Sequence, residues 1–173
     1  FRPPEQICRL RALRCQMVNL VSERTKCVQW MQKSLDQMNV QVHRAVSDIT
    51  GKTGMKIIRS IVDGQRDPNH LGTLRDPRCR KSAEEIAEYL TGTWREEHLF
   101  TLASALRLFD AIQAELDAFE AKVTKELEEM AGPAGIDAEP PSHPNPAKER
   151  VIRRRGDQKT RSLLWQLSGV DLL

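Results

Sequence analysis

Hydrophobic residues recur every three or four positions along the first part of the chain, from Glu5 to about Met38. This spacing places them on one side of an α-helix, and neither Gly nor Pro interrupts the run. A helix of roughly 34 residues spans about 50 Å at the α-helical rise, which exceeds an ordinary globular helix. The pattern therefore predicts a long helix that pairs with another in a coiled coil. Its apolar positions are Ile7, Leu10, Leu13, Met17, Leu20, Val21, Cys27, Val28, Met31, Leu35 and Met38.

A second long helix is predicted after Gly92. Thr93 followed by Glu96 fits a capping box at its start, and Gly132 with Pro133 ends it. One apolar column of this helix repeats every seven residues, while the neighbouring column shifts along the helix. Such a rotating seam contacts more than one neighbour, so we predict that it mediates oligomerisation. The seven-residue column consists of Leu102, Phe109, Leu116, Val123 and Met130.

The two predicted long helices carry opposite charge. Lys and Arg outnumber Asp and Glu on the first helix, whereas Glu and Asp predominate on the second. Opposite charges on paired helices set orientation and partner choice more than stability. We therefore expect the two helices to pack antiparallel, within one chain or across a dimer.

Residues 39–92 show a different pattern, with short apolar pieces between frequent turn signals. The segment TGMKIIRSIVDG predicts a short helix that Gly64 ends. In SAEEIAEYLTG, Ser82 is the predicted N-cap, Glu85 completes a capping box and Gly92 ends the helix. We interpret this segment as a small helical head on the coiled coil.

The letters GKT at residues 51–53 also occur at the end of a nucleotide-binding P-loop. That motif requires a further glycine five positions before Gly51, and this position is Val46. The preceding residues, VHRAVSDIT, lack the pattern of a buried strand. Without the first glycine the loop amides cannot surround the phosphates, so we do not expect a nucleotide-hydrolysing enzyme.

The two glycines of the TG-x-TG segment allow two interpretations. In the first, they form the turn that links two helices. In the second, the amides of this turn meet a nucleic-acid phosphate at a helix N-terminus, with help from Lys52, Lys56 and Arg59. The pattern alone leaves both open.

Composition narrows the class of protein. Apolar residues make up 39%, charged residues 29% and aromatic residues 5%, which is typical of a helix-rich protein with a thin core. No signal peptide or transmembrane run is present, so we expect a cytoplasmic protein without a membrane partner. The four cysteines lack C-x-x-C spacing and the four histidines are scattered, which predicts free thiols and no metal site. No group of residues supports catalysis.

The last part of the chain is predicted to be a flexible Pro/Gly linker at 132–147 and a basic segment with a short helix at 148–173. The complete predicted fold is all-α, with a coiled-coil domain over 1–131 before the linker. A charge run is more often solvated surface, but beside a linker it also suits contact with a nucleic-acid backbone. The candidate residues are Arg153, Arg154, Arg155, Lys159 and Arg161.

The order of several phrases resembles one family. VSDITGKTGMKIIRSIVDGQRDP is followed by LRDPRC, then by IAEYLTGTWREEHLF and the long helix, then by a Pro-rich linker, RRR and LSGVDLL. Together they resemble the middle of a DEDD-type insertion-sequence transposase, a recombinase that is guided by a bridge RNA. The resemblance covers essentially the whole chain.

This resemblance implies an RNase-H-like domain before Phe1, with an acidic tetrad that uses a divalent metal such as Mg²⁺. It also implies a transposase domain with a nucleophilic serine after Leu173. The chain would then be a non-catalytic coiled-coil fragment with no cofactor of its own. Its implied role is to associate as a dimer or tetramer, and to help hold guide RNA and DNA during transposition in a prokaryotic cytoplasm.

A second hypothesis also fits the pattern of long helices. An unrelated helical scaffold or adaptor would use them to bind a partner protein. It would dimerise without any salt-dependent binding of nucleic acid, which distinguishes the two hypotheses.

Overall fold

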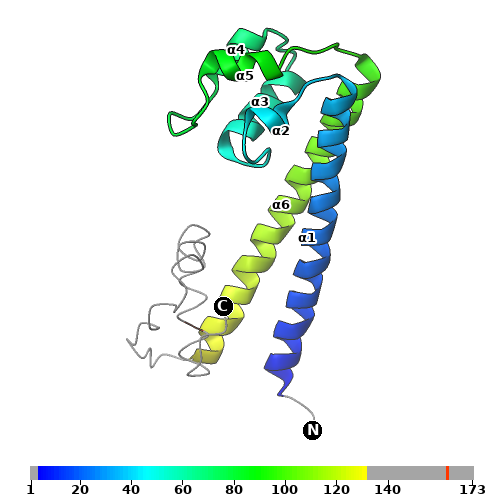
Figure 1. The fold of residues 1–173 in the computed structure, drawn as a ribbon. Helices are drawn as coiled ribbons and strands as arrows, with labels where there is room; N and C mark the ends of the chain where they lie inside the picture. Colours follow the sequence, from blue (N-terminus) through cyan, green and yellow to red (C-terminus); the bar gives the residue numbers. More distant parts are fainter. Residues whose placement is uncertain (1–3, 132–162, 164–173) are drawn as a thin grey trace. The chain divides into compact units, whose positions relative to one another are not determined.

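The computed structural model describes residues 4–131 and residue 163, and every regular element in this part of the chain is a helix (Figure 1). The chain divides into two compact units. One spans Leu20–Ala114, and the described parts of the other are residues 4–19 and 115–131. The helices are α1 (Glu5–Gln37), α2 (Val42–Ala45), α3 (Lys52–Val62), α4 (Pro68–Thr73), α5 (Ala83–Tyr89) and α6 (Glu96–Ala131).

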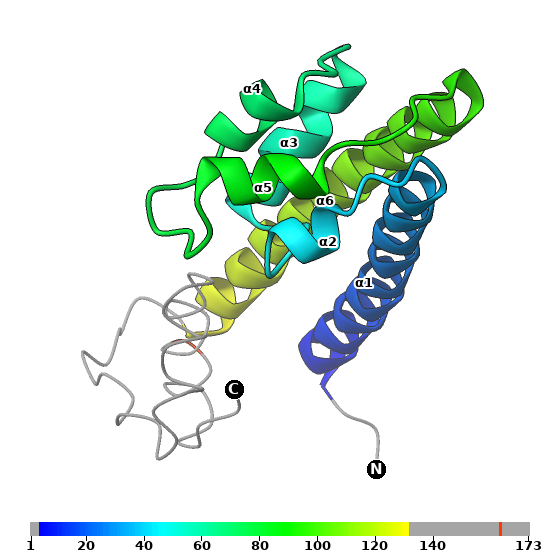
Figure 2. The same cartoon turned by 45° about the horizontal axis from the view of Figure 1, so that its top comes forward.

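Helix α1 packs on helix α6, as the apolar pattern predicts. Within the Leu20–Ala114 unit the two helices lie side by side and run in opposite directions (Figures 1 and 2). Met31 and Leu35 of α1 share one buried core with Leu102 and Leu106 of α6. Burial of each such side chain stabilises the fold by about 1.5–3 kcal/mol. The predicted antiparallel pairing is therefore confirmed within a single chain.

The helical head belongs to the same core. Ile57, Ile58 and Ile61 of α3 have no exposed surface and join the cluster that α1 and α6 form. The remaining short helices pack on one another, α2 and α4 both against α5. The head is therefore folded onto the paired helices through α3, because these isoleucines occupy one side of that helix.

Two of the predicted helix signals in the head are confirmed. The Ser82 side chain accepts a hydrogen bond from the Glu85 amide at 3.1 Å, and the Glu85 carboxylate accepts one from the Ser82 amide at 2.7 Å. Gly64 follows the end of α3 with a φ of 102°, a conformation that favours glycine. Local sequence chemistry therefore sets these two helix ends.

Two predicted helix ends near α6 are wrong. Helix α5 ends at Tyr89, before Gly92, and α6 begins at Glu96, so Arg95 precedes it and not Thr93. The chain in between follows the end of α1, where the Thr93 amide donates to the Met38 carbonyl at 2.8 Å. A Cβ on Gly92 would lie 2.4 Å from that same carbonyl oxygen. Gly92 therefore permits a close approach of two backbones, which a helix pattern does not reveal.

The unit of residues 4–19 and 115–131 also pairs α1 with α6. Leu116 and Leu127 are buried in it. The pKa of Arg9 is raised, first by a hydrogen bond to Glu5 and then, more weakly, by the charge of Glu126. Arg9 of α1 therefore lies within electrostatic reach of Glu126 of α6.

Candidate nucleic-acid interface

The TG-x-TG segment, residues 50–54, covers the end of the turn between α2 and α3 and the first residues of α3. The Asp48 carboxylate accepts hydrogen bonds from the Thr50 amide at 2.8 Å and from the Thr50 hydroxyl at 2.7 Å, which fixes the turn. A Cβ on Gly54 would lie 2.3 Å from the Ile49 carbonyl oxygen, so only glycine fits there without movement. Gly51 is the N-cap of α3 and has no side chain to bind the first amides. The glycines thus have a structural role: Gly51 precedes α3 as its N-cap, and Gly54 lets the first turn of α3 pack against Ile49.

The three cations predicted beside this turn differ in their surroundings. Lys52 and Lys56 are exposed at the first turns of α3. Arg59 donates two hydrogen bonds to the Asp110 carboxylate of α6, at 2.6 and 2.7 Å. This hydrogen-bonded carboxylate raises the pKa of Arg59. Arg59 therefore connects α3 to α6, a role that the sequence did not indicate.

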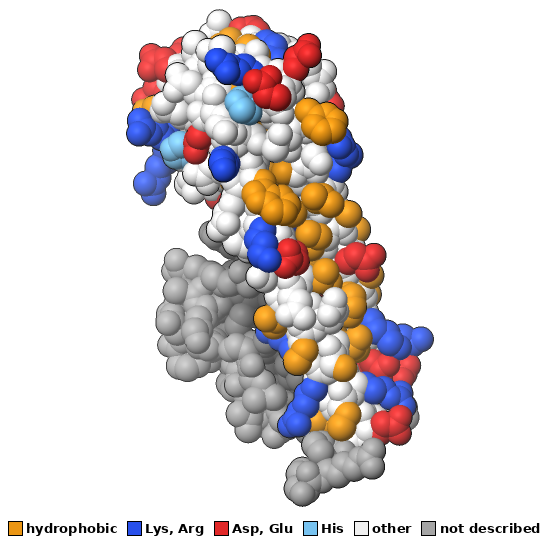
Figure 3. Space-filling model, turned by 90° about the vertical axis from the view of Figure 1, so that its right-hand side faces the viewer, with side chains coloured by type: hydrophobic (Ala, Val, Ile, Leu, Met, Phe, Trp, Pro, Cys, Tyr) orange, Lys and Arg blue, Asp and Glu red, His pale blue; other side chains and the backbone are white. Residues whose placement is uncertain are grey.

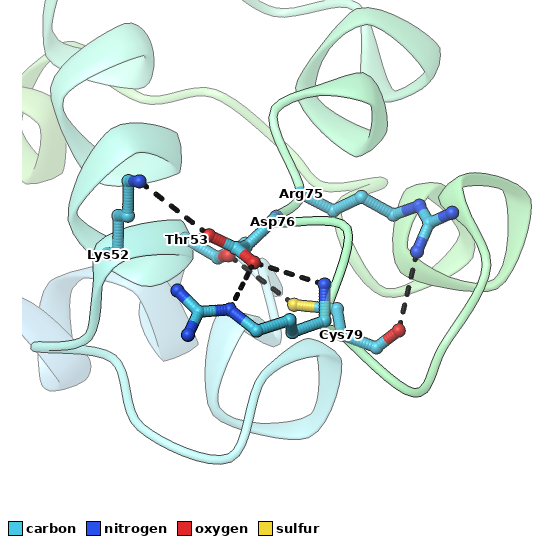
Figure 4. A network of polar contacts seen from close by, with 6 residues as sticks. Lys52, Thr53, Arg75, Asp76 and Cys79 are labelled. Carbon is cyan, nitrogen blue, oxygen red and sulfur yellow. Dashed lines mark hydrogen bonds and ion pairs between the residues drawn. The ribbon is translucent and has the colours of Figure 1, made fainter.

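Lys52 lies beside a polar network that fixes the loop of residues 75–81 (Figure 4). The buried Thr53 hydroxyl accepts a hydrogen bond from the Asp76 amide at 3.0 Å. The Asp76 carboxylate accepts bonds from the amide and from Nε of Arg78, at 3.0 and 3.2 Å. These bonds lower the pKa of Asp76, the amide contributing most. The carboxylate thereby holds the loop against the start of α3.

The other end of this loop is fixed by backbone acceptors. Arg75 donates from Nη1 to the Cys79 carbonyl at 3.3 Å and to the Lys81 carbonyl at 3.4 Å. The Lys81 ammonium donates to the Arg44 carbonyl and lies 4.2 Å from the centre of the Tyr89 ring. Arg75 therefore stabilises the loop from within, and Lys81 attaches its end to α2 and α5.

Sequence reasoning missed this loop as a candidate site. The signal was present, because RDPRCRK at 75–81 contains four basic residues and one acidic residue. Arg78 and Arg80 are exposed, and the Arg78 side chain retains 88% of its accessible surface. What the sequence could not show is that Lys52, 23 positions earlier than Arg75, lies beside the same loop.

Two of the phrases that carry the family resemblance meet in the head. Arg66, in DGQRDP, places its guanidinium 4.9 Å from the centre of the Trp94 ring, which belongs to GTWREEHLF. The same guanidinium donates to the Gln65 carbonyl at 2.8 Å and to the Ile61 carbonyl at the end of α3. A stacked and hydrogen-bonded arginine of this kind fixes how the end of α3 meets the segment before α6.

Part of the predicted interface lies outside the described residues. Arg153, Arg154, Arg155, Lys159 and Arg161 belong to this part, as do the predicted linker and C-terminal helix. Their binding role stays a prediction.

The predicted oligomerisation column is largely covered by the chain itself. Leu102 and Phe109 belong to the core of the Leu20–Ala114 unit, Leu116 is buried, and Val123 and Met130 are half-buried. One face of the long helices nevertheless shows a gathering of hydrophobic side chains (Figure 3). Within residues 4–130, the large hydrophobic residues with exposed side chains are Val18, Val21, Trp30, Phe100 and Leu108.

Other kinds of site receive no support from residues 4–131. No helix there has both the length and the apolar character needed to cross a membrane. No group of His, Cys, Asp and Glu in that range is arranged to hold a metal ion. Comparisons with protein-family models, with curated proteins and with solved structures give no match. The candidate function is therefore supported only by the sequence and contacts of this chain, and not by similarity to a known protein.

Proposed function

We propose that this chain is the non-catalytic coiled-coil region of a DNA transposase that resembles the DEDD-type insertion-sequence recombinases. It associates with further copies of itself and contributes to the binding of guide RNA and DNA. The observation that carries the proposal is the ordered set of phrases from TG-x-TG to SGVDLL. The acidic tetrad with its Mg²⁺ and the nucleophilic serine would belong to other parts of such a transposase.

The roles of these phrases in the head support the proposal. Gly54 allows α3 to pack on the preceding turn, and Arg66 stacks on Trp94. We expect a protein that shares these phrases to share both contacts, so the phrases point to a family more strongly together than any of them does alone.

Self-association is part of the proposal. The exposed apolar residues are the best candidates for the contact between two copies. Phe100 retains 71% of its accessible surface, Leu108 48% and Trp30 46%. When a second copy covers exposed aromatic and leucine side chains, apolar surface is removed from water, and this makes association more favourable. We propose that these exposed residues, more than the buried Leu102 and Phe109, contact the second copy.

Nucleic-acid binding by the basic segment is tested with Arg153, Arg154 and Arg155 all changed to Ala. If these residues contact phosphates, the variant binds RNA or duplex DNA more weakly, and its affinity depends less on salt. A titration of labelled nucleic acid at several salt concentrations measures both quantities. An unchanged salt dependence would remove this segment from the interface. Dimers that bind no nucleic acid at any salt concentration would favour the scaffold hypothesis.

A further inference from the structure

Positive charge on the helical head gathers at the loop of residues 75–81, which connects α4 to α5. The Lys52 ammonium lies 3.7 Å from the Asp76 carboxylate, and the Lys81 ammonium bonds to the backbone of Arg44. These contacts bring basic residues from three segments of the chain to one surface. The members are Arg44, Lys52, Arg75, Arg78, Arg80 and Lys81, which we call the loop cluster.

Acidic residues neutralise the loop cluster only in part. Asp76 is shared by Lys52 and Arg78, and only 16% of its side chain is exposed, against 68% and 88% for the two cations. Asp48, in the turn before α3, keeps its negative charge while it accepts two hydrogen bonds from Thr50. Glu84 and Glu85 lie in the first turn of α5, and the pKa of Glu84 is lowered, first by backbone and Ser82 hydrogen bonds and more weakly by the charge of Arg75. These carboxylates offset part of the charge of the loop cluster, and Arg78 and Arg80 remain exposed cations on the loop itself.

The loop that carries this charge is also held in one conformation. The Thr53 hydroxyl binds the Asp76 amide, and the Cys79 amide donates to the Asp76 carbonyl at 2.8 Å. Arg75 binds two further carbonyls of the loop. Cations on an ordered backbone lose less conformational entropy on binding than cations on a free chain. Arg78 and Arg80 are thus presented to solvent from a fixed support.

We propose that the loop cluster is the surface of the head that contacts the phosphodiester backbone of nucleic acid. The inference rests on the proposed function and names the residues within it. The cations are spread along an exposed loop, which suits successive phosphates of a polyanion better than one small anion. Arg59, which the sequence pattern placed with the phosphate-binding cations, forms an ion pair with Asp110 between α3 and α6, so we leave it out of the loop cluster.

The test uses the full 173-residue chain and a double variant, Arg78→Ala with Arg80→Ala. A matched control, Lys33→Ala with Arg107→Ala, removes two exposed positive charges from α1 and α6. Affinity is measured by fluorescence anisotropy between ~50 and ~200 mM salt, a range over which phosphate contacts weaken strongly. One arm uses a DNA duplex and the other an RNA hairpin of matched length, so the arms identify which nucleic acid the loop contacts.

We expect the loop variant to lower the slope of log affinity against log salt by about one per lost contact, so by about two in total. The control should leave the slope close to that of the unchanged protein. A third variant, Thr53→Val, keeps every charge but removes the support of the Asp76 amide. It should weaken binding with little change in slope. Thermal melting of each variant tests whether any loss of affinity comes from unfolding of the protein.

Different failures have different meanings. If the loop variant and the control have the same slope, the loop cluster is not the contact surface. If, in addition, the change at Arg153, Arg154 and Arg155 lowers the slope, the proposed function stands without this inference. If the unchanged protein shows no salt-dependent binding in either arm, both the proposed function and the inference are wrong.

Discussion

At the scale of single residues, one carboxylate organises the basic loop of the head. Asp76 accepts two hydrogen bonds from Arg78, and its own amide binds the Thr53 hydroxyl. A half-buried carboxylate that accepts bonds from an arginine is stabilised in its charged form. Its ionisation therefore contributes to the stability of the folded head.

We predict that Asp76→Asn makes the stability of the protein less dependent on pH. Because the folded state lowers the pKa of Asp76, the stabilisation is complete above the unfolded pKa of about 3.9 and is lost as pH falls through the folded value. The variant should be less stable than the unchanged protein at neutral pH, and the difference should shrink below about pH 4. Urea unfolding at a series of pH values measures it.

The control for this prediction is Glu88→Gln, which changes an exposed carboxylate on α5. It should affect stability little at any pH. A difference between Asp76→Asn and the unchanged protein that stays constant down to acidic pH would contradict the role given to the Asp76 charge.

We also predict that a substitution at Gly54 destabilises the protein. Gly54→Ala places a Cβ 2.3 Å from the Ile49 carbonyl oxygen, so the turn or α3 must move. Overpacking of this kind typically costs about 1–3 kcal/mol in the free energy of unfolding. Gly51→Ala is the matched control, since its Cβ would come no nearer than 3.1 Å to the Asp48 carbonyl. Equal losses in denaturant unfolding for both variants would show that the close packing at Gly54 is not decisive.

At the scale of elements, the long helices were predictable and the ends of some short ones were not. The three- and four-residue apolar spacing indicated α1 and α6, because burial of one helix side leaves a direct mark on the sequence. The capping box at Ser82 and Glu85 is equally local. Gly92 was misinterpreted because its close approach to Met38 joins segments far apart in the sequence.

The candidate site likewise contains features that the sequence predicted and contacts that it could not predict. Lys52 and Lys56 were predicted from a pattern beside the TG-x-TG turn, and the structure leaves both exposed. The ion pair of Arg59 with Asp110 joins residues 51 positions apart, and no local pattern reveals such a contact. The meeting of Lys52 with the loop of residues 75–81 was hidden for the same reason.

The division of roles on α6 leads to a paired prediction. Leu102 is fully buried in the core, whereas Leu108 is 48% exposed on the same helix. Leu102→Ala should lower the free energy of unfolding by about 2–5 kcal/mol, the usual cost of such a cavity. Leu108→Ala should change it little but weaken self-association. Unfolding in urea and sedimentation at several protein concentrations separate the two effects, and a large loss of stability in Leu108→Ala would contradict this assignment.

At the scale of the whole molecule, the chain combines a long helix pair with a small head that carries positive charge. The paired helices leave Trp30, Phe100 and Leu108 exposed, and the head carries the loop cluster. The first feature favours contact with protein, and the second favours contact with a polyanion. A chain that joins copies of itself around nucleic acid needs both.

The most direct test of this account is sedimentation velocity of the full chain, alone and with a labelled RNA hairpin or DNA duplex, at low and high salt. The account predicts an oligomer at tens of micromolar protein that carries the labelled nucleic acid at low salt and releases it as salt rises. A monomer at these concentrations would contradict the proposed self-association. An oligomer that leaves both nucleic acids free at every salt concentration would contradict the proposed function and identify the chain as a protein-binding scaffold.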